Sequence, residues 1–216
     1  MVMRWFLLLV CPLLLGLTPL TWQDSFLTRV ELLAVIETLN AELLSNSSAT
    51  LTLERWCSGH GLAREAKLVA HLERGAQKPL TGQDRERLAA GAADEVRYRH
   101  VRLFCGDKLL SEADNWYVPG RLTPEMNRVL DETDTPFGRA VRDLDFRRET
   151  LSAKLLWSPR PDRWEMSPPY PSSGSRLEAP DHILEHRAIL RANGGTPFSL
   201  VVETYTRDVL AFALPQ

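Results

Sequence analysis

The stretch that decides the fold runs from Val96 to Arg139 and reads VRYRHVRLFCGDKLLSEADNWYVPGRLTPEMNRVLDETDTPFGR. It predicts a β-hairpin that closes on Gly106-Asp107, because a short turn with glycine joins two runs of strand-forming residues. A helix is predicted to begin at Thr123-Pro124, since threonine caps helices and proline suits the first helical turn. A second short helix follows Thr135-Pro136. The stretch therefore predicts antiparallel strands with helices packed beside them.

Arg99 is the first candidate for a binding residue. Alternate residues of a strand share one face, and Arg99 shares its face with Val101, Leu103 and Cys105. A buried guanidinium is costly unless an anion meets it. One candidate anion is Glu203, in a late apolar strand, and the other is the carboxylate of a ligand. A structural ion pair and a ligand site therefore both remain open.

These residues and two further motifs resemble the chorismate lyase family. The motifs are Arg-x-Val-x-Leu from Arg99, a returning strand that ends in Val118-Pro119, the element Thr135-Pro-Phe-Gly-Arg139 and the strand with Glu203. The resemblance extends from Leu32 to the C-terminus. It implies an antiparallel sheet flanked by helices and a cofactor-free conversion of chorismate to 4-hydroxybenzoate and pyruvate. The family is also similar in fold to the effector-binding domains of some bacterial transcription regulators.

The same resemblance implies the site residues. Arg99 matches the carboxylate-binding arginine of the family, and Glu203 matches its active-site glutamate. Phe137 and Gly138 match the segment whose backbone approaches the ligand. Asn115 stands where the family has a second ligand-binding arginine, which removes a charge but keeps a group that can donate a hydrogen bond. We therefore expect Glu203 and Arg99 to be catalytic, and all five residues to contact the substrate.

Charge and the N-terminus suggest where the chain acts. The chain has 26 basic and 28 acidic residues, without the basic excess of a nucleic-acid surface, so no nucleic-acid partner is expected. Arg4 and the apolar run Trp5–Leu20 are typical of an export signal. We predict that residues 1–24 form a signal peptide or a membrane anchor and that the protein is exported. A buried N-terminal helix or a misplaced start codon is the alternative.

Without that segment the chain retains two cysteines, Cys57 and Cys105. An even number of cysteines in an exported protein permits one disulfide. Cysteine also occurs as a separate buried apolar residue. We expect free thiols, because Cys57 lies in a predicted helix, Cys105 ends a predicted strand, and the sequence does not indicate that they meet.

The remaining segments complete a single domain over residues 25–216. Residues 158–181 are rich in proline and serine and are predicted to form a mobile surface loop. Residues 63–74 fit a helix or a strand, and the resemblance favours a strand. The other expected elements are helices over 22–44, 50–57 and 81–93 and strands over 150–157, 183–191 and 196–205, the last two joined by Asn193-Gly194-Gly195.

The fold class that these segments predict is α+β, with one mostly antiparallel sheet of about six strands. We expect a monomer with a pocket for a small aromatic or cyclic carboxylic acid and without a cofactor. The predicted function is chorismate lyase-like, with Glu203 at the ring hydroxyl. The alternatives are a non-catalytic exported module that binds such an acid, and an envelope protein that makes protein contacts. His182 and His186 are four residues apart, but a strand is expected from Ile183, which argues against a helical metal site.

Overall fold

Hydrophobic alternation and helix caps produce an antiparallel sheet with helices on it. The computed structural model describes residues 21–169 and 174–212, so most of the predicted signal or anchor segment, residues 1–20, lies outside the described residues. The helices are α1 (Phe26–Ser45), α2 (Ala49–Gly59), α3 (Gly82–Arg87), α4 (Pro124–Glu132) and α5 (Phe137–Ala140). The strands are β1 (Thr21–Gln23), β2 (Leu68–Leu72), β3 (Arg97–Cys105), β4 (Lys108–Tyr117), β5 (Arg147–Leu155), β6 (Arg176–Glu178), β7 (His182–Arg191) and β8 (Pro197–Thr206).

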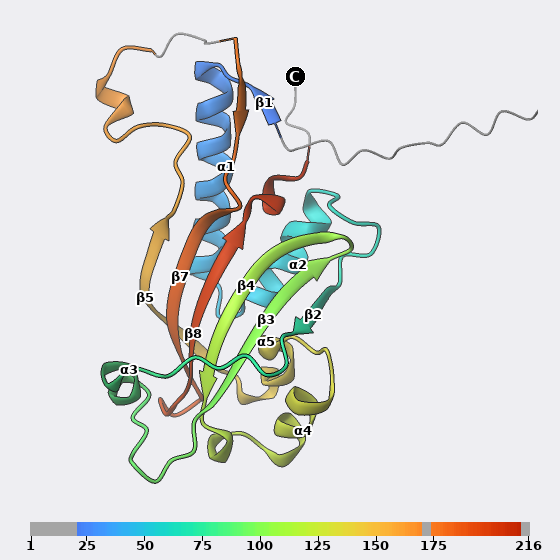
Figure 1. The fold of residues 1–216 in the computed structure, drawn as a ribbon, viewed down its shortest axis with the longest axis vertical. Helices are drawn as coiled ribbons and strands as arrows, with labels where there is room; N and C mark the ends of the chain where they lie inside the picture. The colour runs from blue at the N-terminus through green and yellow to red at the C-terminus, as the bar shows by residue number, and fades with distance from the viewer. Residues whose placement is uncertain (1–20, 170–173, 213–216) are drawn as a thin grey trace, which may run out of the picture.

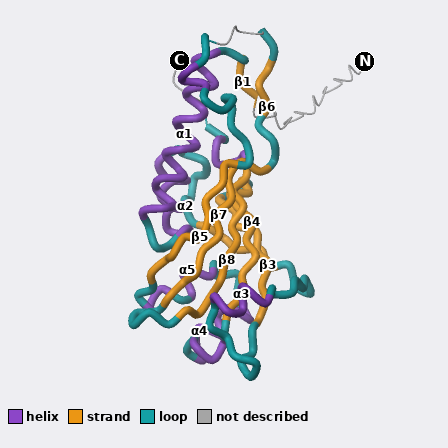
Figure 2. Tube along the Cα trace, turned by 90° about the vertical axis from the view of Figure 1, so that its left-hand side faces the viewer, coloured by secondary structure: helices purple, strands orange, loops and turns teal. Residues whose placement is uncertain are grey.

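The main sheet has six antiparallel strands in the order β2-β3-β4-β8-β7-β5. Helices α1 and α2 lie on one face of it (Figures 1 and 2). Leu88, directly after α3, packs on the opposite face with Trp116 and Leu200. The predicted fold class is therefore confirmed: the domain is α+β, with one antiparallel sheet and flanking helices.

Local sequence signals set most of the element boundaries. β3 and β4 are joined by Gly106 and Asp107 alone, as predicted. Gly106 has a φ of 59°, and an added Cβ would lie 2.8 Å from the Cβ of Ala63, so both backbone conformation and space require glycine here. Thr123 caps α4 by accepting a hydrogen bond from the backbone N–H of Met126 at 3.1 Å. The central hairpin and its helix therefore follow from local chemistry.

Two predicted helices have different boundaries. The segment 22–44 divides into β1 and α1, because Ser25 accepts a hydrogen bond from the N–H of Thr28 and starts α1 there. α3 is capped by Thr81 as predicted but ends at Arg87, because Ala89 adopts a positive φ of 48°. The strand predicted over 63–74 is confirmed as β2, which is shorter.

The segment 158–181, predicted to be a mobile loop, contains a short strand. β6 pairs with β1 to form a two-stranded sheet. The guanidinium of Arg160 lies 4.4 Å from the ring centre of Phe26 and 5.2 Å from that of Trp164. These contacts attach the segment to the start of α1.

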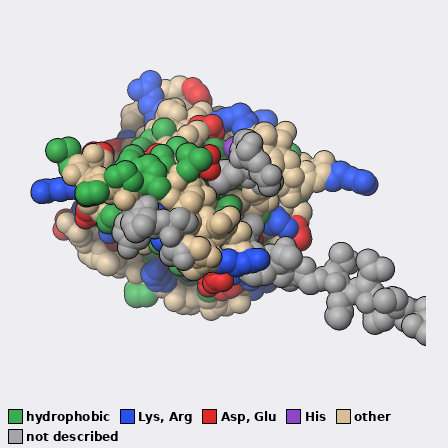
Figure 3. Space-filling view, turned by 90° about the horizontal axis from the view of Figure 1, so that it is seen from above, with side chains coloured by type: hydrophobic (Ala, Val, Ile, Leu, Met, Phe, Trp, Pro, Cys, Tyr) green, Lys and Arg blue, Asp and Glu red, His purple; other side chains and the backbone are tan. Residues whose placement is uncertain are grey.

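Apolar side chains gather on the end of the molecule shown in Figure 3. Leu27, in the first turn of α1, is 64% exposed, and Met166 in the 158–181 segment is 83% exposed. None of the helices in the described part of the chain is both long enough and apolar enough to cross a membrane.

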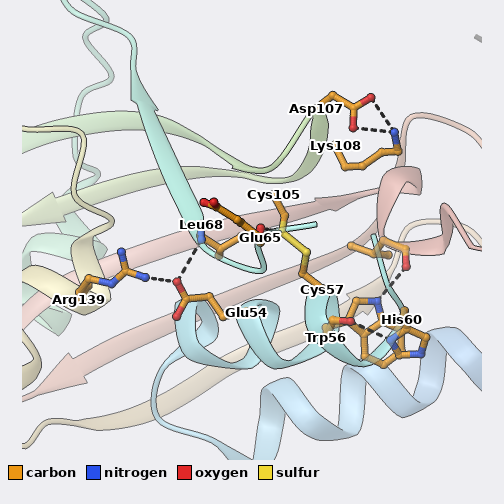
Figure 4. Close-up of a disulfide and its surroundings, with 11 residues drawn as sticks. Glu54, Trp56, Cys57, His60, Glu65, Leu68, Cys105, Asp107, Lys108 and Arg139 are labelled. Atoms are coloured by element: carbon orange, nitrogen blue, oxygen red, sulfur yellow. Dashed lines mark hydrogen bonds and ion pairs between the residues drawn. A yellow bond between two sulfur atoms is a disulfide. The ribbon is translucent and has the colours of Figure 1, made fainter. Parts of the chain in front are cut away.

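Cys57 and Cys105 form a disulfide, so the expectation of free thiols is wrong. The bond joins the third turn of α2 to the end of β3, with Cα atoms 6.6 Å apart (Figure 4). The sequence indicates the helix and the strand separately. Only the packing of α2 on the sheet brings the two thiols together.

Loss of this disulfide should destabilise the fold. The bond closes a loop with a sequence separation of 48 residues, for which loop entropy predicts a loss of about 4 kcal/mol. We expect the Cys57→Ser/Cys105→Ser variant to show a free energy of unfolding in urea lower by about 2–4 kcal/mol. Equal stability of the variant and the oxidised protein would contradict this expectation.

Candidate functional site

A small, partly open cavity lies between the sheet and the first turn of α2. Its volume is about 40 Å³, which holds only a few water molecules. Two helices cover it: α2 with its cap, through Ser47–Thr50, and α5, through Phe137 and Gly138. Its floor comes from β3, β4, β5, β7 and β8, through Val101, Leu103, Ala113, Asn115, Arg148, Leu190, Val201 and Glu203, with Phe146 at one side.

A buried ion pair provides the charge in this cavity. Arg148 donates a hydrogen bond from Nη2 to Oε2 of Glu203 at 2.6 Å, and the two side chains are 3% and 12% exposed. The hydroxyl of Tyr205 also donates to Glu203, at 3.1 Å. Burial alone would lower the pKa of Arg148, but the Glu203 carboxylate raises it above its ordinary value. Among residues 21–169 and 174–212, nothing accepts a hydrogen bond from Nε of Arg148.

Arg148 is the residue that the sequence reasoning missed. The strand was predicted to begin at Thr150, whereas β5 begins at Arg147. β5 pairs with β7, and Arg148 lies opposite Leu190, so its side chain faces the cavity beneath α2. The sequence offers little signal, because Arg147, Arg148 and Glu149 are three consecutive charged residues without alternation. β5 is also an exposed edge strand with little apolar periodicity.

Arg99 and Glu203 share a face of the sheet but do not meet. Arg99 lies opposite Asn115 on β4, and Glu203 lies opposite Ala113, two residues further along. Arg99 is 4% exposed but does not line the cavity; it lines a separate open groove. The alternative of a structural Arg99–Glu203 ion pair is wrong, because Glu203 pairs with Arg148.

Asn115, Phe137 and Gly138 lie in the cavity wall, where the sequence reasoning expected ligand contacts. Asn115 is buried and its Oδ1 accepts a hydrogen bond from the hydroxyl of Ser199 at 2.5 Å. Phe137 packs on Tyr117, with ring centres 5.5 Å apart. An added Cβ on Gly138 would lie 3.0 Å from Oγ of Ser48, so glycine permits α5 to approach α2.

An ion pair fixes the two helices that cover the cavity. Arg139 of α5 donates to the carboxylate of Glu54 in α2, and the same carboxylate accepts from the backbone N–H of Leu68 in β2 at 3.1 Å. Figure 4 shows this bridge beside the disulfide. Helices α2 and α5 and strand β2 are therefore linked through one glutamate.

His186 lies in the core behind the ion pair. It is fully buried, and its Nε2 lies 2.8 Å from Oδ1 of Asn40 in α1. Burial, reinforced by the positive charge of Arg148, lowers its pKa to about 4. It does not approach His182 in a metal site: among the described residues, no group of three or more histidine, cysteine, aspartate or glutamate side chains could hold an ion.

Acid should destabilise the protein through His186. Its pKa is about 4 in the folded protein against an ordinary value of 6.5, so the unfolded chain binds the proton first. The contribution of neutral His186 to the free energy of unfolding is fully present above about pH 6.5. It decreases by about 3 kcal/mol as the pH falls towards 4. Urea unfolding at pH 7 and pH 4.5 should show a smaller pH effect for His186→Gln. If the variant shows the same pH dependence as the wild type, His186 is not the group responsible for the acid destabilisation.

Replacing one partner of the buried ion pair should lower the free energy of unfolding more than replacing both partners. Arg148→Met or Glu203→Gln leaves one partner buried without its counter-charge, which costs about 3–5 kcal/mol. The double variant Arg148→Met/Glu203→Gln should regain most of that loss. Denaturant unfolding of the four proteins measures the coupling energy, and additive losses would mean that the two side chains act independently.

Comparisons with known proteins place this chain in a family and a fold. No protein-family model matches it. It is 56% identical over 196 residues to y4mC, an uncharacterized protein of Sinorhizobium fredii (strain NBRC 101917 / NGR234), and the match covers 90% of this chain and 83% of y4mC. The chain belongs to the family of y4mC. This relationship does not assign an activity.

Among solved structures, the fold matches PhnF from Mycobacterium smegmatis with a TM-score of 0.50 and 11% identity, over 80% of this chain and 69% of PhnF. A ligand-binding domain assigned to a GntR-family transcriptional regulator of Bordetella bronchiseptica matches with a TM-score of 0.40 and 13% identity, over 64% of this chain and 82% of that domain. The match to PhnF supports the chorismate lyase-like fold, whereas the comparisons do not confirm membership of the lyase family.

The predicted function, a chorismate lyase or an exported module for an aromatic or cyclic acid, is wrong. The fold match with a TM-score of 0.50 is to PhnF and not to a lyase. The site gives a physical reason against the lyase reaction: the cavity of about 40 Å³ is far below the roughly 300 Å³ of a pre-formed small-molecule pocket, so it does not hold a substrate in a fixed reactive geometry. Asn115 also lacks the charge of the second family arginine.

The same comparison contradicts two further predictions: that the protein is exported, and that it has no nucleic-acid partner. Export was predicted from the apolar run before Thr21, which lies outside the described residues. The exclusion of nucleic acid came from the balanced charge of this chain. That charge balance concerns only the residues of this chain, and it does not exclude that the chain has a role in a regulator.

Proposed function

We propose that the chain is a regulatory sensor domain that binds a small anion in the cavity beneath α2. The observation that carries the proposal is the unpartnered Nε of Arg148 in the cavity wall. A buried donor without an acceptor costs free energy, and an anion in the cavity would supply the acceptor. Glu203 would accept a hydrogen bond from a hydroxyl group of the same ligand.

The start of α2 favours the same charge. Ser48 caps this helix, and Ser48 and Thr50 line the cavity. The N-terminus of a helix carries partial positive charge and free N–H groups, which attract anions. The ligand would therefore lie between a helix terminus and the guanidinium of Arg148.

The size of the cavity supports a sensing role. A space of about 40 Å³ must enlarge to admit an organic anion, and its covering elements are α2 and α5. The first turn of α2 precedes both the Arg139–Glu54 ion pair and the disulfide, so ligand entry would displace this turn and the neighbouring α5. A displacement of this kind is a signal that a partner can read, as the regulatory context of the similar folds suggests.

A ligand screen tests the proposal. Thermal unfolding with a panel of small anions, including sulfate, hydroxy acids and sugar phosphates, should identify a ligand. At a concentration 100 times its Kd it should raise the midpoint by about 5–10 °C. Hydrogen exchange in α2 and α5 should change on binding, and mass spectrometry should recover the ligand intact.

Two variants one residue apart provide the control. Ala113→Leu fills the cavity without changing a charge and should abolish the shift, whereas Glu112→Gln alters the opposite face of β4 and should preserve it. A panel without any stabilising anion, or a ligand that Ala113→Leu still binds, would overturn the proposal. If mass spectrometry shows that the ligand has been chemically converted, the site is catalytic and the sensor proposal is wrong.

A further inference from the structure

Helix α1 has a second apolar face on the side opposite its buried face. The residues that it buries in the core are Leu32, Ile36, Leu39 and Leu43. Alternating steps of three and four residues keep side chains in one line along a helix. On the outer side such a line consists of Leu27, Val30, Ala34, Glu37, Ala41 and Leu44. All of these except Glu37 are apolar, so α1 is apolar on two opposite sides.

The described residues leave most of this outer face uncovered. Leu27 is 64% exposed and Leu44 is 45% exposed, one at each end of the line, and Ala34 and Ala41 between them are also exposed. The helix lies on the outside of the domain (Figure 2). A helix that is apolar on both sides is normally buried on both sides, because apolar surface in water is unfavourable. The outer face therefore suits an apolar partner.

The exposed apolar surface continues beyond the first turn of α1. The rings of Phe26 and Trp164 pack edge to face, with centres 6.3 Å apart. Met166 belongs to the same short 3-10 helix as Trp164 and is 83% exposed. Figure 3 shows apolar side chains gathered at this end of the molecule. A partner that follows α1 therefore also meets apolar surface where the helix begins.

The charges beside the outer face are acidic. In residues 21–169 and 174–212, no cation forms an ion pair with Glu31, Glu37 or Glu42. Arg29 is the basic residue of α1, and it pairs with Asp24 at 2.5 Å. A second copy of α1 would bring like charges together, which is unfavourable. A partner that is both apolar and basic fits the face better.

The chain itself contains a segment of this chemistry. Arg4 is followed by the apolar run Trp5–Leu20, and residues 4–20 contain no acidic residue. The run joins β1 at Thr21, close to the N-terminal end of α1 (Figures 1 and 2). The Asp24–Arg29 ion pair holds the residue after β1 against the first turns of that helix. The run therefore ends next to the apolar outer face.

The run is long enough to follow the helix. The 20 residues of α1 span about 30 Å at 1.5 Å per residue. Between Arg4 and Thr21 the chain spans about 25 Å as a helix and roughly twice that distance when extended. An antiparallel arrangement would place Arg4 near the last turns of α1. Glu37 and Glu42 lie in that half of the helix.

We infer that the outer face of α1 is a docking surface for residues 4–20 of the same chain. The run lies antiparallel to α1, its apolar side chains contact the line from Leu27 to Leu44, and Arg4 meets Glu37 or Glu42. This is the buried N-terminal segment that the sequence offers as the alternative to an export signal. The inference does not rest on the proposed sensor function, because no residue of α1 lines the cavity beneath α2.

Disulfide cross-linking in the full-length chain tests the inference. Cys11 lies in the middle of the run, and the other two cysteines are bonded to each other. Val30→Cys, Ala34→Cys and Ala41→Cys each add a thiol on the outer face. Mild oxidation should join Cys11 to at least one of these positions within a single chain, in more than half of the molecules. Glu125→Cys is the control, because Glu125 lies on α4 with a side chain 65% exposed, and it should not cross-link to Cys11.

Cross-links that join two chains would make a second copy the occupant of the face and would overturn the inference. The absence of any cross-link from the three positions would overturn it as well. So would purified protein whose intact mass shows that residues 1–20 have been removed.

The rate of thiol alkylation provides a second readout. The thiol added by Ala34→Cys should react with N-ethylmaleimide at least tenfold more slowly than the thiol added by Glu125→Cys, because the run covers it. The further substitutions Leu8→Asp and Leu14→Asp place charges in the run and should restore fast alkylation at position 34. Equally fast alkylation at positions 34 and 125 before these substitutions would overturn the inference. Slow alkylation that persists after them would mean that another partner covers the face, with the same consequence.

Discussion

The buried ion pair between Arg148 and Glu203 is the interaction around which the helix-covered face of the sheet is arranged. The two residues come from β5 and β8, with β7 between them, so the pair ties three strands across the face. Two charges in the interior are tolerated only when they compensate each other. The rest of that face carries mainly aliphatic and aromatic side chains, with Arg99, Asn115 and His186 as further buried polar residues.

The covering helices are held by contacts of a different kind. The disulfide fixes one end of α2 to β3, and Glu54 connects the middle of α2 to α5 and to β2. The first turn of α2, at the cavity, is free of both constraints. The C-terminal end of α2 is fixed, and its N-terminal end carries the partial positive charge of a helix terminus. Such a helix suits a site that opens when a ligand enters. This arrangement, rather than the fold alone, favours sensing.

The separation of Arg99 from Glu203 gives the domain two distinct polar spaces. Both residues lie on strands with apolar neighbours, and both are near the same face. Across β4 the two residues are offset by two positions in register, and Arg99 lies in an open groove whereas Glu203 lies in a smaller, partly open cavity. The residues that the sequence pattern groups into one site therefore line two separate spaces.

The sequence by itself determined the local elements. The Gly106-Asp107 turn, the Thr123 cap and the alternation in β7 and β8 require only neighbours along the chain, and these predictions agree with the structure. It also identified Asn115, Phe137, Gly138 and Glu203, which meet in one cavity wall. Only the tertiary structure decided that Cys57 bonds Cys105, that Arg148 neutralises Glu203 and that Arg99 lies elsewhere. Each of these depends on strand order, register and helix placement, which long-range packing fixes and local patterns do not encode.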